Sequence, residues 1–128
     1  MKRRLPDPCP CGLPRSYTDC CGRLHGGMPA ADAEALMRSR YSAYVKGLEA
    51  YLLATWHATT RPQALGLADS PPPKWLGLEV MSSAESDDEA TVEFVARCRI
   101  GGRAQRLRER SRFRREQGRW YYLDGITA

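Results

Sequence analysis

Four cysteines near the start of the chain form the residue set with the most specific chemistry. They fall within 13 residues, in a C-x-C-x8-C-C arrangement, at Cys9, Cys11, Cys20 and Cys21. Two closely spaced thiolate pairs joined by a loop are able to surround a Zn²⁺ ion tetrahedrally, at Zn–S distances of about 2.3 Å. The spacing therefore predicts one zinc ion held by these four residues. Such a site has a net charge of −2, which we expect Arg15, Arg23 and the basic run Lys2 to Arg4 to offset.

Other interpretations of the same cysteines stay open. A disulfide between Cys20 and Cys21, or a redox pair, would use the same residues, but the ring of a vicinal disulfide is strained and a reducing compartment disfavours it. His25 is placed to replace one sulfur, although a solvated loop histidine is the simpler interpretation. Four protein ligands leave no open coordination position, so we expect the metal to organise structure rather than to catalyse a reaction.

A change in hydrophobic period predicts the elements that position the other candidate residues. Helical spacing covers residues 32–46 and 48–56, and alternation covers 75–81, 91–100, 103–115 and 119–123. Helices followed by an antiparallel meander predict an α+β fold in which helices pack on a curved sheet. Gly101-Gly102 suits a two-residue hairpin turn, which sets residue 100 opposite residue 103.

This register places Glu109 on the apolar face of the hairpin, where an unpaired carboxylate is costly. We expect Arg40, with Arg38 as the alternative, to supply its partner from the first helix. The pair would be either a structural buried bridge or part of a pocket. His57 is a further candidate pocket group, although capping of the last helix carbonyls is the simpler interpretation.

Three remaining features have simple structural interpretations. Asp124 before Gly125 is expected to form a turn. Cys98, in a predicted strand, is expected to be a small buried hydrophobe or an inert thiol. Large aromatic residues at Trp56, Trp75, Trp120 and Tyr122 are candidates for a pocket wall, although core packing is the commoner role.

The other hairpin face carries an arginine stripe on one strand: Arg106, Arg108, Arg110, Arg112 and Arg114. Such a row is able to lie along a phosphate backbone, which makes nucleic-acid or ribosome binding a hypothesis. The register also sets Glu93 against Arg110 and Glu89 against Arg114. A solvated, partly salt-bridged sheet face is therefore the simpler interpretation.

Length and composition limit the function classes. The chain has 128 residues, 42% of them hydrophobic, with 20 Lys and Arg against 15 Asp and Glu for a net charge of +5. These values predict one folded domain with a small appendage and exclude a large multidomain protein. The sequence contains no apolar run of membrane-spanning length, so we expect a cytoplasmic protein without membrane insertion.

Two sets of segments resemble known families. Cys9-Pro-Cys-Gly and Cys20-Cys-Gly resemble the SEC-C motif, a zinc-binding knuckle known from the SecA preprotein-translocating ATPase. Five later segments resemble, in order, the bacterial YchJ family: Leu36-Met-Arg-Ser-Arg-Tyr-Ser-Ala-Tyr, Trp56-His, Trp75-Leu-Gly-Leu, Glu109-Arg-Ser-Arg-Phe and Trp120-Tyr-Tyr-Leu-Asp-Gly. The resemblance covers nearly the whole chain and implies a knuckle over residues 1–27. A nuclear-transport-factor-like or cystatin-like α+β roll would follow over residues 28–128.

The family resemblance implies no biochemical activity that transfers to this chain. We expect a protein-binding or adaptor module, whose partner would, by analogy with SecA, belong to translocation or ribosome-associated machinery. The first alternative is a small-ligand binder or enzyme that uses a pocket between helices and sheet, with Arg40, His57 and Glu109 as polar groups. The second alternative is nucleic-acid or ribosome binding through the arginine stripe.

Overall fold

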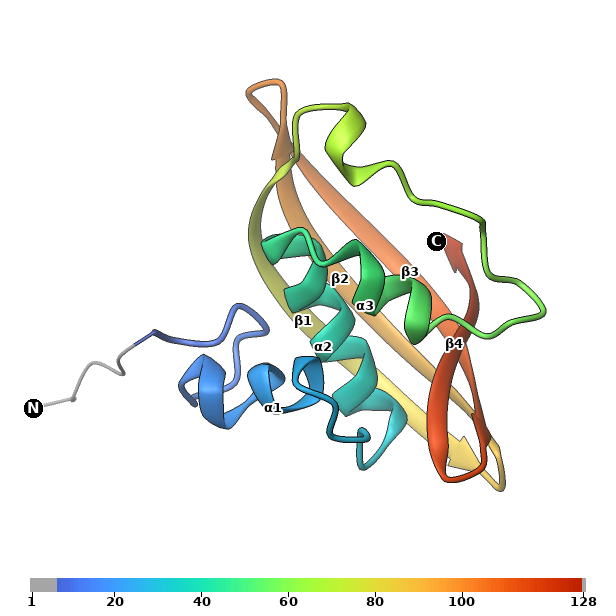
Figure 1. The fold of residues 1–128 in the computed structure, drawn as a ribbon. Helices are drawn as coiled ribbons and strands as arrows, with labels where there is room; N and C mark the ends of the chain where they lie inside the picture. Colours follow the sequence, from blue (N-terminus) through green and yellow to red (C-terminus); the bar gives the residue numbers. More distant parts are fainter. Residues whose placement is uncertain (1–6, 128) are drawn as a thin grey trace, which may run out of the picture.

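A cysteine-rich segment, two further helices and one antiparallel sheet follow each other along the chain in a computed structural model that describes residues 7–127 (Figure 1). The helices are α1 (Cys21–His25), α2 (Ala33–Lys46) and α3 (Glu49–Ala54), with short 3-10 turns at Tyr17–Asp19 and Leu67–Asp69. The strands are β1 (Lys74–Ser86), β2 (Glu89–Ile100), β3 (Arg103–Glu116) and β4 (Arg119–Thr127). This order confirms the α+β prediction.

The sheet has the order β1-β2-β3-β4 and curves around α2 (Figure 1). Gly101 and Gly102 have φ angles of 56° and 79°, and Ile100 pairs with Arg103, so the predicted hairpin register is confirmed. Register shifts interrupt β1 against β2 and β3 against β4. Such bulges bend a strand and increase its twist, which accounts for the curvature.

All four strands extend beyond their predicted ranges, β1 and β4 by the most. β1 continues through a polar, exposed stretch to Ser86, where a loop was expected, because a tight turn at residues 87–88 lets β1 and β2 stay paired to their ends. β4 continues to Thr127, so the predicted turn at Asp124 and Gly125 is wrong: Asp124 pairs with Arg112 across the β3–β4 ladder.

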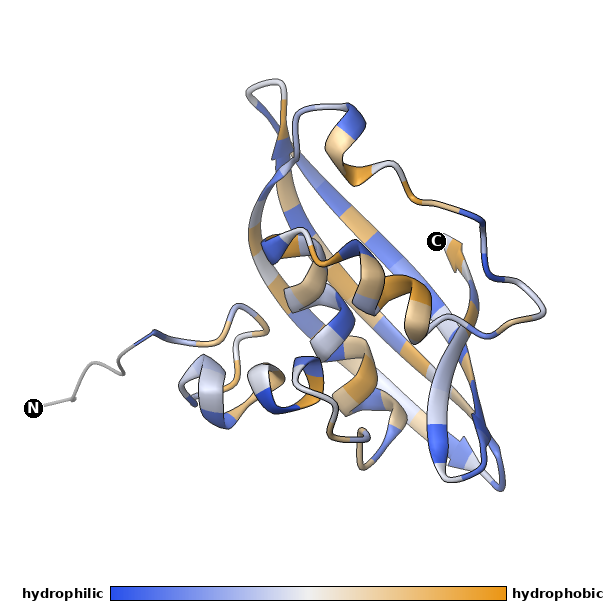
Figure 2. Ribbon diagram, viewed as in Figure 1, coloured by the Kyte–Doolittle hydropathy of each residue, from blue (hydrophilic) through white to orange (hydrophobic). Residues whose placement is uncertain are grey.

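The helix α2 lies across the concave face of the sheet and supplies most of the helical core. Asp32 caps its N-terminus by accepting a hydrogen bond from the backbone N–H of Ala35 at 2.7 Å, and the helix ends at Gly47. Hydrophilic and hydrophobic residues alternate along the strands (Figure 2). The apolar sheet residues meet α2 in one buried cluster: Ala33, Leu36, Met37, Tyr41, Ala90, Val92, Ala96, Phe113 and Trp120. Within residues 7–127, no helix is both long and apolar enough to cross a bilayer.

Candidate functional site

The cysteine cluster, defined as Cys9, Cys11, Cys20 and Cys21, is brought together in the structure. All four residues are buried free thiols, and their Sγ atoms lie within 4.8 Å of one another. The Sγ atoms of Cys11 and Cys20 are 3.6 Å apart. A tetrahedral zinc ion with Zn–S bonds of about 2.3 Å requires S–S separations of about 3.8 Å, so the donor set fits a metal of this kind.

Backbone hydrogen bonds shape the loop that carries the cluster. Cys9 donates to the carbonyl of Arg15 at 3.0 Å, and Gly12 donates back to the carbonyl of Cys9 at 3.2 Å. Gly22 follows the cysteine pair at a point where a Cβ atom would lie only 2.6 Å from the carbonyl oxygen of Tyr17. The Cys-Cys-Gly sequence therefore meets a packing requirement, because only glycine lets α1 approach the preceding turn so closely.

Thiols of the cysteine cluster shift one another's pKa because they lie close together. Hydrogen bonding from Cys21 lowers the pKa of Cys11 to about 5, whereas burial raises the pKa of Cys20 to about 11. The hydrogen bond to Cys11, together with burial, raises the pKa of Cys21 well above its usual range. Of these three thiols, Cys11 therefore loses its proton most readily. A divalent cation would favour the thiolate form of the others as well, since metal binding displaces thiol protons.

The knuckle, residues 7–27 of the described chain, packs on α2. Arg38 donates from Nη1 to the carbonyl of Cys11 at 2.9 Å, and the hydroxyl of Ser42 lies 3.7 Å from Cys9 Sγ. His25 Nε2 donates to the carbonyl of Ser39 at 2.8 Å. The sequence left open whether this segment is docked or freely tethered; these contacts show it docked.

His25 is not the solvated loop residue that was expected. Because the Ser39 carbonyl that Nε2 contacts can only accept, Nε2 carries the proton and Nδ1 accepts from the hydroxyl of Tyr17 at 2.6 Å. Burial is the main cause that lowers the pKa of His25, which keeps the ring neutral. His25 therefore joins the knuckle to α2 and lies outside the cysteine cluster. The basic run Lys2 to Arg4, expected to offset the cluster's charge, lies outside the described residues.

A chamber of about 220 Å³ lies between α2 and the concave face of the sheet. Its walls are mainly aromatic and aliphatic, with side chains from α2 and from all four strands. Arg40 from α2 and Glu109 from β3 line the same chamber, as do the hydroxyl-bearing Tyr44 and Tyr122. Trp75 and Tyr122 also line it, whereas Trp120 is 4% exposed in the core.

Arg40 is only 6% exposed and is held by its surroundings rather than by a carboxylate. Its Nη1 donates to the carbonyl of Leu52 and to the hydroxyl of Thr55, both at 2.7 Å. The guanidinium lies 5.1 Å from the ring centroid of Trp56 and 4.5 Å from that of Tyr122. Burial lowers the pKa of Arg40, although an arginine side chain stays charged in a protein.

Glu109 does not form the expected ion pair with Arg40. Among residues 7–127 no carboxylate lies within 4.0 Å of the Arg40 guanidinium, and Glu109 Oε2 instead accepts a short hydrogen bond from the hydroxyl of Ser111. The side chain lies against Gly125 of β4, where an added Cβ would come within 2.9 Å of Glu109 Cγ. The predicted register placed Glu109 on the correct face of the sheet. Its carboxylate is accommodated there by the Ser111 hydroxyl, which donates to it, and by Gly125, which leaves space for it.

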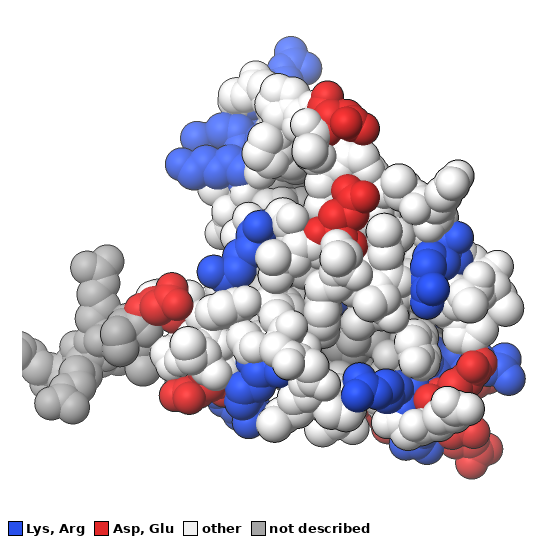
Figure 3. Space-filling model, in the orientation of Figure 1, with Lys and Arg blue, Asp and Glu red and all other residues white. Residues whose placement is uncertain are grey.

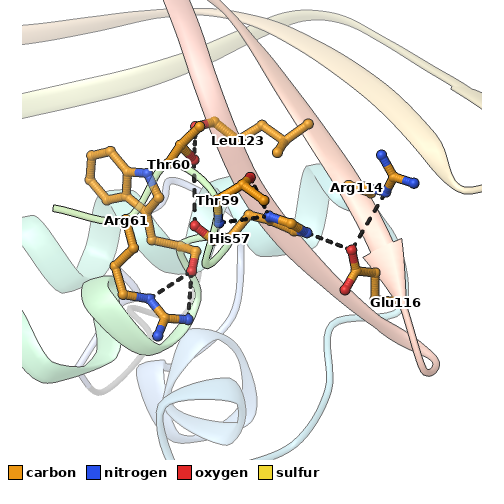
Figure 4. Close-up of polar contacts among 8 residues, drawn as sticks. His57, Thr59, Thr60, Arg61, Arg114, Glu116 and Leu123 are labelled. Atoms are coloured by element: carbon orange, nitrogen blue, oxygen red, sulfur yellow. Dashed lines mark hydrogen bonds and ion pairs between the residues drawn. The ribbon is translucent and has the colours of Figure 1, made fainter.

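His57 lies outside the chamber and does not cap α3. Residues 55–57 run beside β4, with the backbone of His57 donating to the carbonyl of Tyr122 at 2.7 Å. The ring accepts from the Thr59 hydroxyl at Nδ1 and donates from Nε2 to Glu116 (Figure 4). His57 therefore connects the segment after α3 to the end of β3, where its partner Glu116 is half-exposed, and it does not line the chamber.

The arginine stripe lies on the exposed face of the sheet, and much of its charge is matched. Three members form ion pairs: Arg108 with Glu93, Arg112 with Asp124 and Arg114 with Glu116. Arg106 stands opposite Arg97 and has no ion pair within residues 7–127, and Arg110 likewise has none there. Figure 3 shows the helix side, where basic and acidic side chains are interspersed.

The family model described as the middle, NTF2-like domain of YchJ matches residues 32–125. The chain belongs to the YchJ family. A UPF0225 protein of Chromobacterium violaceum is 55% identical to it, over 99% of this chain and 98% of the relative. One from Methylibium petroleiphilum is 58% identical, over 96% and 90%.

Two solved structures resemble this YchJ family member. The solution structure of a SEC-C motif containing protein from Rhodopseudomonas palustris has a TM-score of 0.79 at 37% identity, covering 94% of this chain and 98% of that one. A crystal structure of a SEC-C motif containing protein from Psychrobacter arcticus has a TM-score of 0.73 at 28% identity, covering 94% and 82%. These matches confirm the predicted YchJ and SEC-C resemblance and the nuclear-transport-factor-like fold.

Proposed function

We propose that this YchJ family member binds a small molecule in the chamber, and that a zinc ion held by the cysteine cluster fixes the knuckle against α2. One observation carries the proposal. A buried guanidinium and a carboxylate line the same cavity without pairing with each other. Charged groups are costly to place in such a site unless something compensates them, and polar groups that converge in an apolar pocket are typical of ligand sites.

The position of the knuckle favours small-molecule binding in the chamber over protein binding by the knuckle. No residue of the segment 7–27 lines the chamber, so the docked knuckle does not cover it. One side of the knuckle is occupied by Arg38, Ser39 and Ser42 of α2 and is not available to a protein partner. Protein binding and nucleic-acid binding through the arginine stripe stay predictions.

Zinc is the metal that the donor set favours, because four thiolates in a tetrahedral arrangement are typical of structural zinc. The four cysteines would fill its coordination sphere, so the metal would supply folding energy to the knuckle and leave binding to the chamber. Loss of the metal should therefore act on the position of the knuckle and of α2.

Phenol is a suitable neutral probe for the proposed function. In ¹H–¹⁵N correlation spectra of the metal-loaded chain, phenol should shift the amide signals of chamber residues in a saturable way. Leu107→Trp should weaken this binding by about fivefold or more, because Leu107 lines the chamber and is partly exposed, so a larger side chain fills space without a large core change. Leu76→Trp is the matched control, since Leu76 is a similarly exposed strand leucine outside the chamber lining. Dispersed, unsaturable shifts, or equal effects of both variants, would overturn the proposal.

A further inference from the structure

We propose that the chamber selects molecules of zero net charge that present a hydrogen-bond acceptor beside a donor on a flat apolar body, as an aromatic carboxamide does. This inference rests on the proposed small-molecule function and names the ligand class. The carboxamide carbonyl would accept from Arg40, and its N–H would donate to Glu109.

The charge balance of the chamber sets the first requirement. Among its lining residues, the ionisable side chains are Arg40, Glu109 and three tyrosines. Burial raises the pKa of the hydroxyls of Tyr41, Tyr44 and Tyr122, so these stay neutral. One positive and one negative charge remain. An anion attracted by Arg40 would be repelled by Glu109, and a cation would meet the reverse.

The hydrogen-bonding character of the two groups sets the second requirement. A guanidinium offers only donors, and within residues 7–127 Arg40 uses Nη1 alone. An ionised carboxylate offers only acceptors, and the Glu109 carboxylate has one protein donor there, the Ser111 hydroxyl. Among residues 7–127 the two groups form no ion pair with each other, although both line the chamber. A planar group with adjacent C=O and N–H satisfies both.

The remaining walls favour a flat apolar body. Trp75, Phe94 and Phe113 line the chamber beside Met37. Aromatic rings pack on such walls at offset or edge-to-face angles, and the chamber's volume of about 220 Å³ holds one substituted ring. The thioether of Met37 adapts to ring edges.

A substitution at Gly125 gives a second, independent way to change the position of Glu109. Its missing side chain makes room for the glutamate, so Gly125→Ala would push the carboxylate from its place beside Ser111. Gly77→Ala is the matched control, because Gly77 is also a strand glycine and a Cβ there would meet nothing within 4 Å. Neither variant changes a charge.

Benzamide, benzoate and benzylamine, which are alike in size, test the proposal on the metal-loaded chain. At pH 7, with binding measured by ¹H–¹⁵N titration, benzamide should bind about tenfold more tightly than either ion. In Glu109→Gln, benzoate should bind about tenfold more tightly than it does to the unchanged protein, because the repulsion is removed and the attraction to Arg40 remains. Gly125→Ala should weaken benzamide by about fivefold, and Gly77→Ala should leave it unchanged.

The outcomes separate the two levels of inference. If phenol and all three probes fail to bind in the chamber, the proposed function fails. If they bind there with equal affinity, or if benzoate is preferred by the unchanged protein, small-molecule binding stands and the selection rule is overturned. Should Glu109→Gln not fold, the glycine pair decides: equal benzamide affinity in both variants contradicts the role assigned to Glu109.

Discussion

At the scale of single residues, the cysteine cluster contacts a hydroxyl group that belongs to α2 and not to the knuckle. Ser42 is fully buried on α2, and its Oγ lies 3.7 Å from Cys9 Sγ. The same hydroxyl counters part of the rise in the pKa of Cys21. Donors of this kind orient metal ligands and are worth about 10- to 100-fold in metal affinity.

Ser42→Ala should therefore weaken zinc binding by about 10- to 100-fold in competition with a chromogenic chelator. Ser39→Ala is the matched control, because Ser39 is equally buried on the same helix but bonds to Leu36 and Tyr51 instead of to sulfur. Equal loss of metal affinity in both variants would show that the effect is general destabilisation of α2.

Residue-level sequence reasoning found the cysteine cluster completely but resolved the chamber only in part. The four cysteines of the C-x-C-x8-C-C motif are close in sequence, so a single loop brings them together and their grouping can be predicted without knowing the rest of the fold. Glu109 was placed on the correct face, yet its partner was assigned to Arg40 because the contribution of Ser111 and the space above Gly125 depend on the β3–β4 register. Asp124-Gly125 was interpreted as a turn because the sequence does not show that both residues pair with β3, where Gly125 leaves space for the side chain of Glu109.

At the scale of elements, short-range turn chemistry determined the register of the central hairpin. Gly101 and Gly102 both adopt positive φ, as the two-residue turn requires, and every predicted pair between β2 and β3 is present. The length of β1 was underestimated because its last six residues are exposed and lack alternation. Pairing with β2 keeps them extended, which no local pattern indicates.

The β3–β4 pairing predicts a small pH dependence of stability. Arg112 donates to both carboxylate oxygens of Asp124, at 2.7 and 2.6 Å, and this holds the pKa of Asp124 below its ordinary value of 3.8. The stabilisation is therefore present above the pKa of the unfolded chain and is lost as the pH falls through the folded value. Both side chains are well exposed, so solvent screening keeps the contribution small.

Asp124→Asn should lower the melting temperature slightly at pH 7, and the difference from the unchanged chain should shrink as the pH falls below the ordinary aspartate value of 3.8. Arg112→Gln and the double variant complete a double-mutant cycle that isolates the pair. A coupling energy that persists at the lowest pH, or that is insensitive to salt, would contradict the ion-pair account.

At the scale of the whole molecule, residues 7–127 contain two separate buried clusters. One contains the cysteines with Leu13 and Tyr17 packed against them, and the other joins α2 to the sheet. The first has few apolar side chains, so we expect it to depend on a bound metal, whereas the second is an ordinary hydrophobic core. Metal removal should accordingly have a local effect.

Chelation should increase amide hydrogen exchange in residues 7–27 and at the α2 surface around Ser39, while β2 and β3 keep their protection. The expected reason is that, when the loop unfolds, His25 loses its bond to the Ser39 carbonyl of α2 and Arg38 of α2 loses its bond to the Cys11 carbonyl. Readdition of zinc should restore the exchange pattern. Uniform loss of protection across the sheet would instead show that the metal supports the whole fold.

A zinc ion in the cysteine cluster is expected to stabilise the docked position of the knuckle on α2, and the most direct test for the ion is native mass spectrometry with a thiol count. Protein purified without chelator should carry one zinc per chain, with Cys9, Cys11, Cys20 and Cys21 protected from alkylation until the metal is removed. Metal-free protein whose four cysteines are reactive or disulfide-bonded would contradict the account.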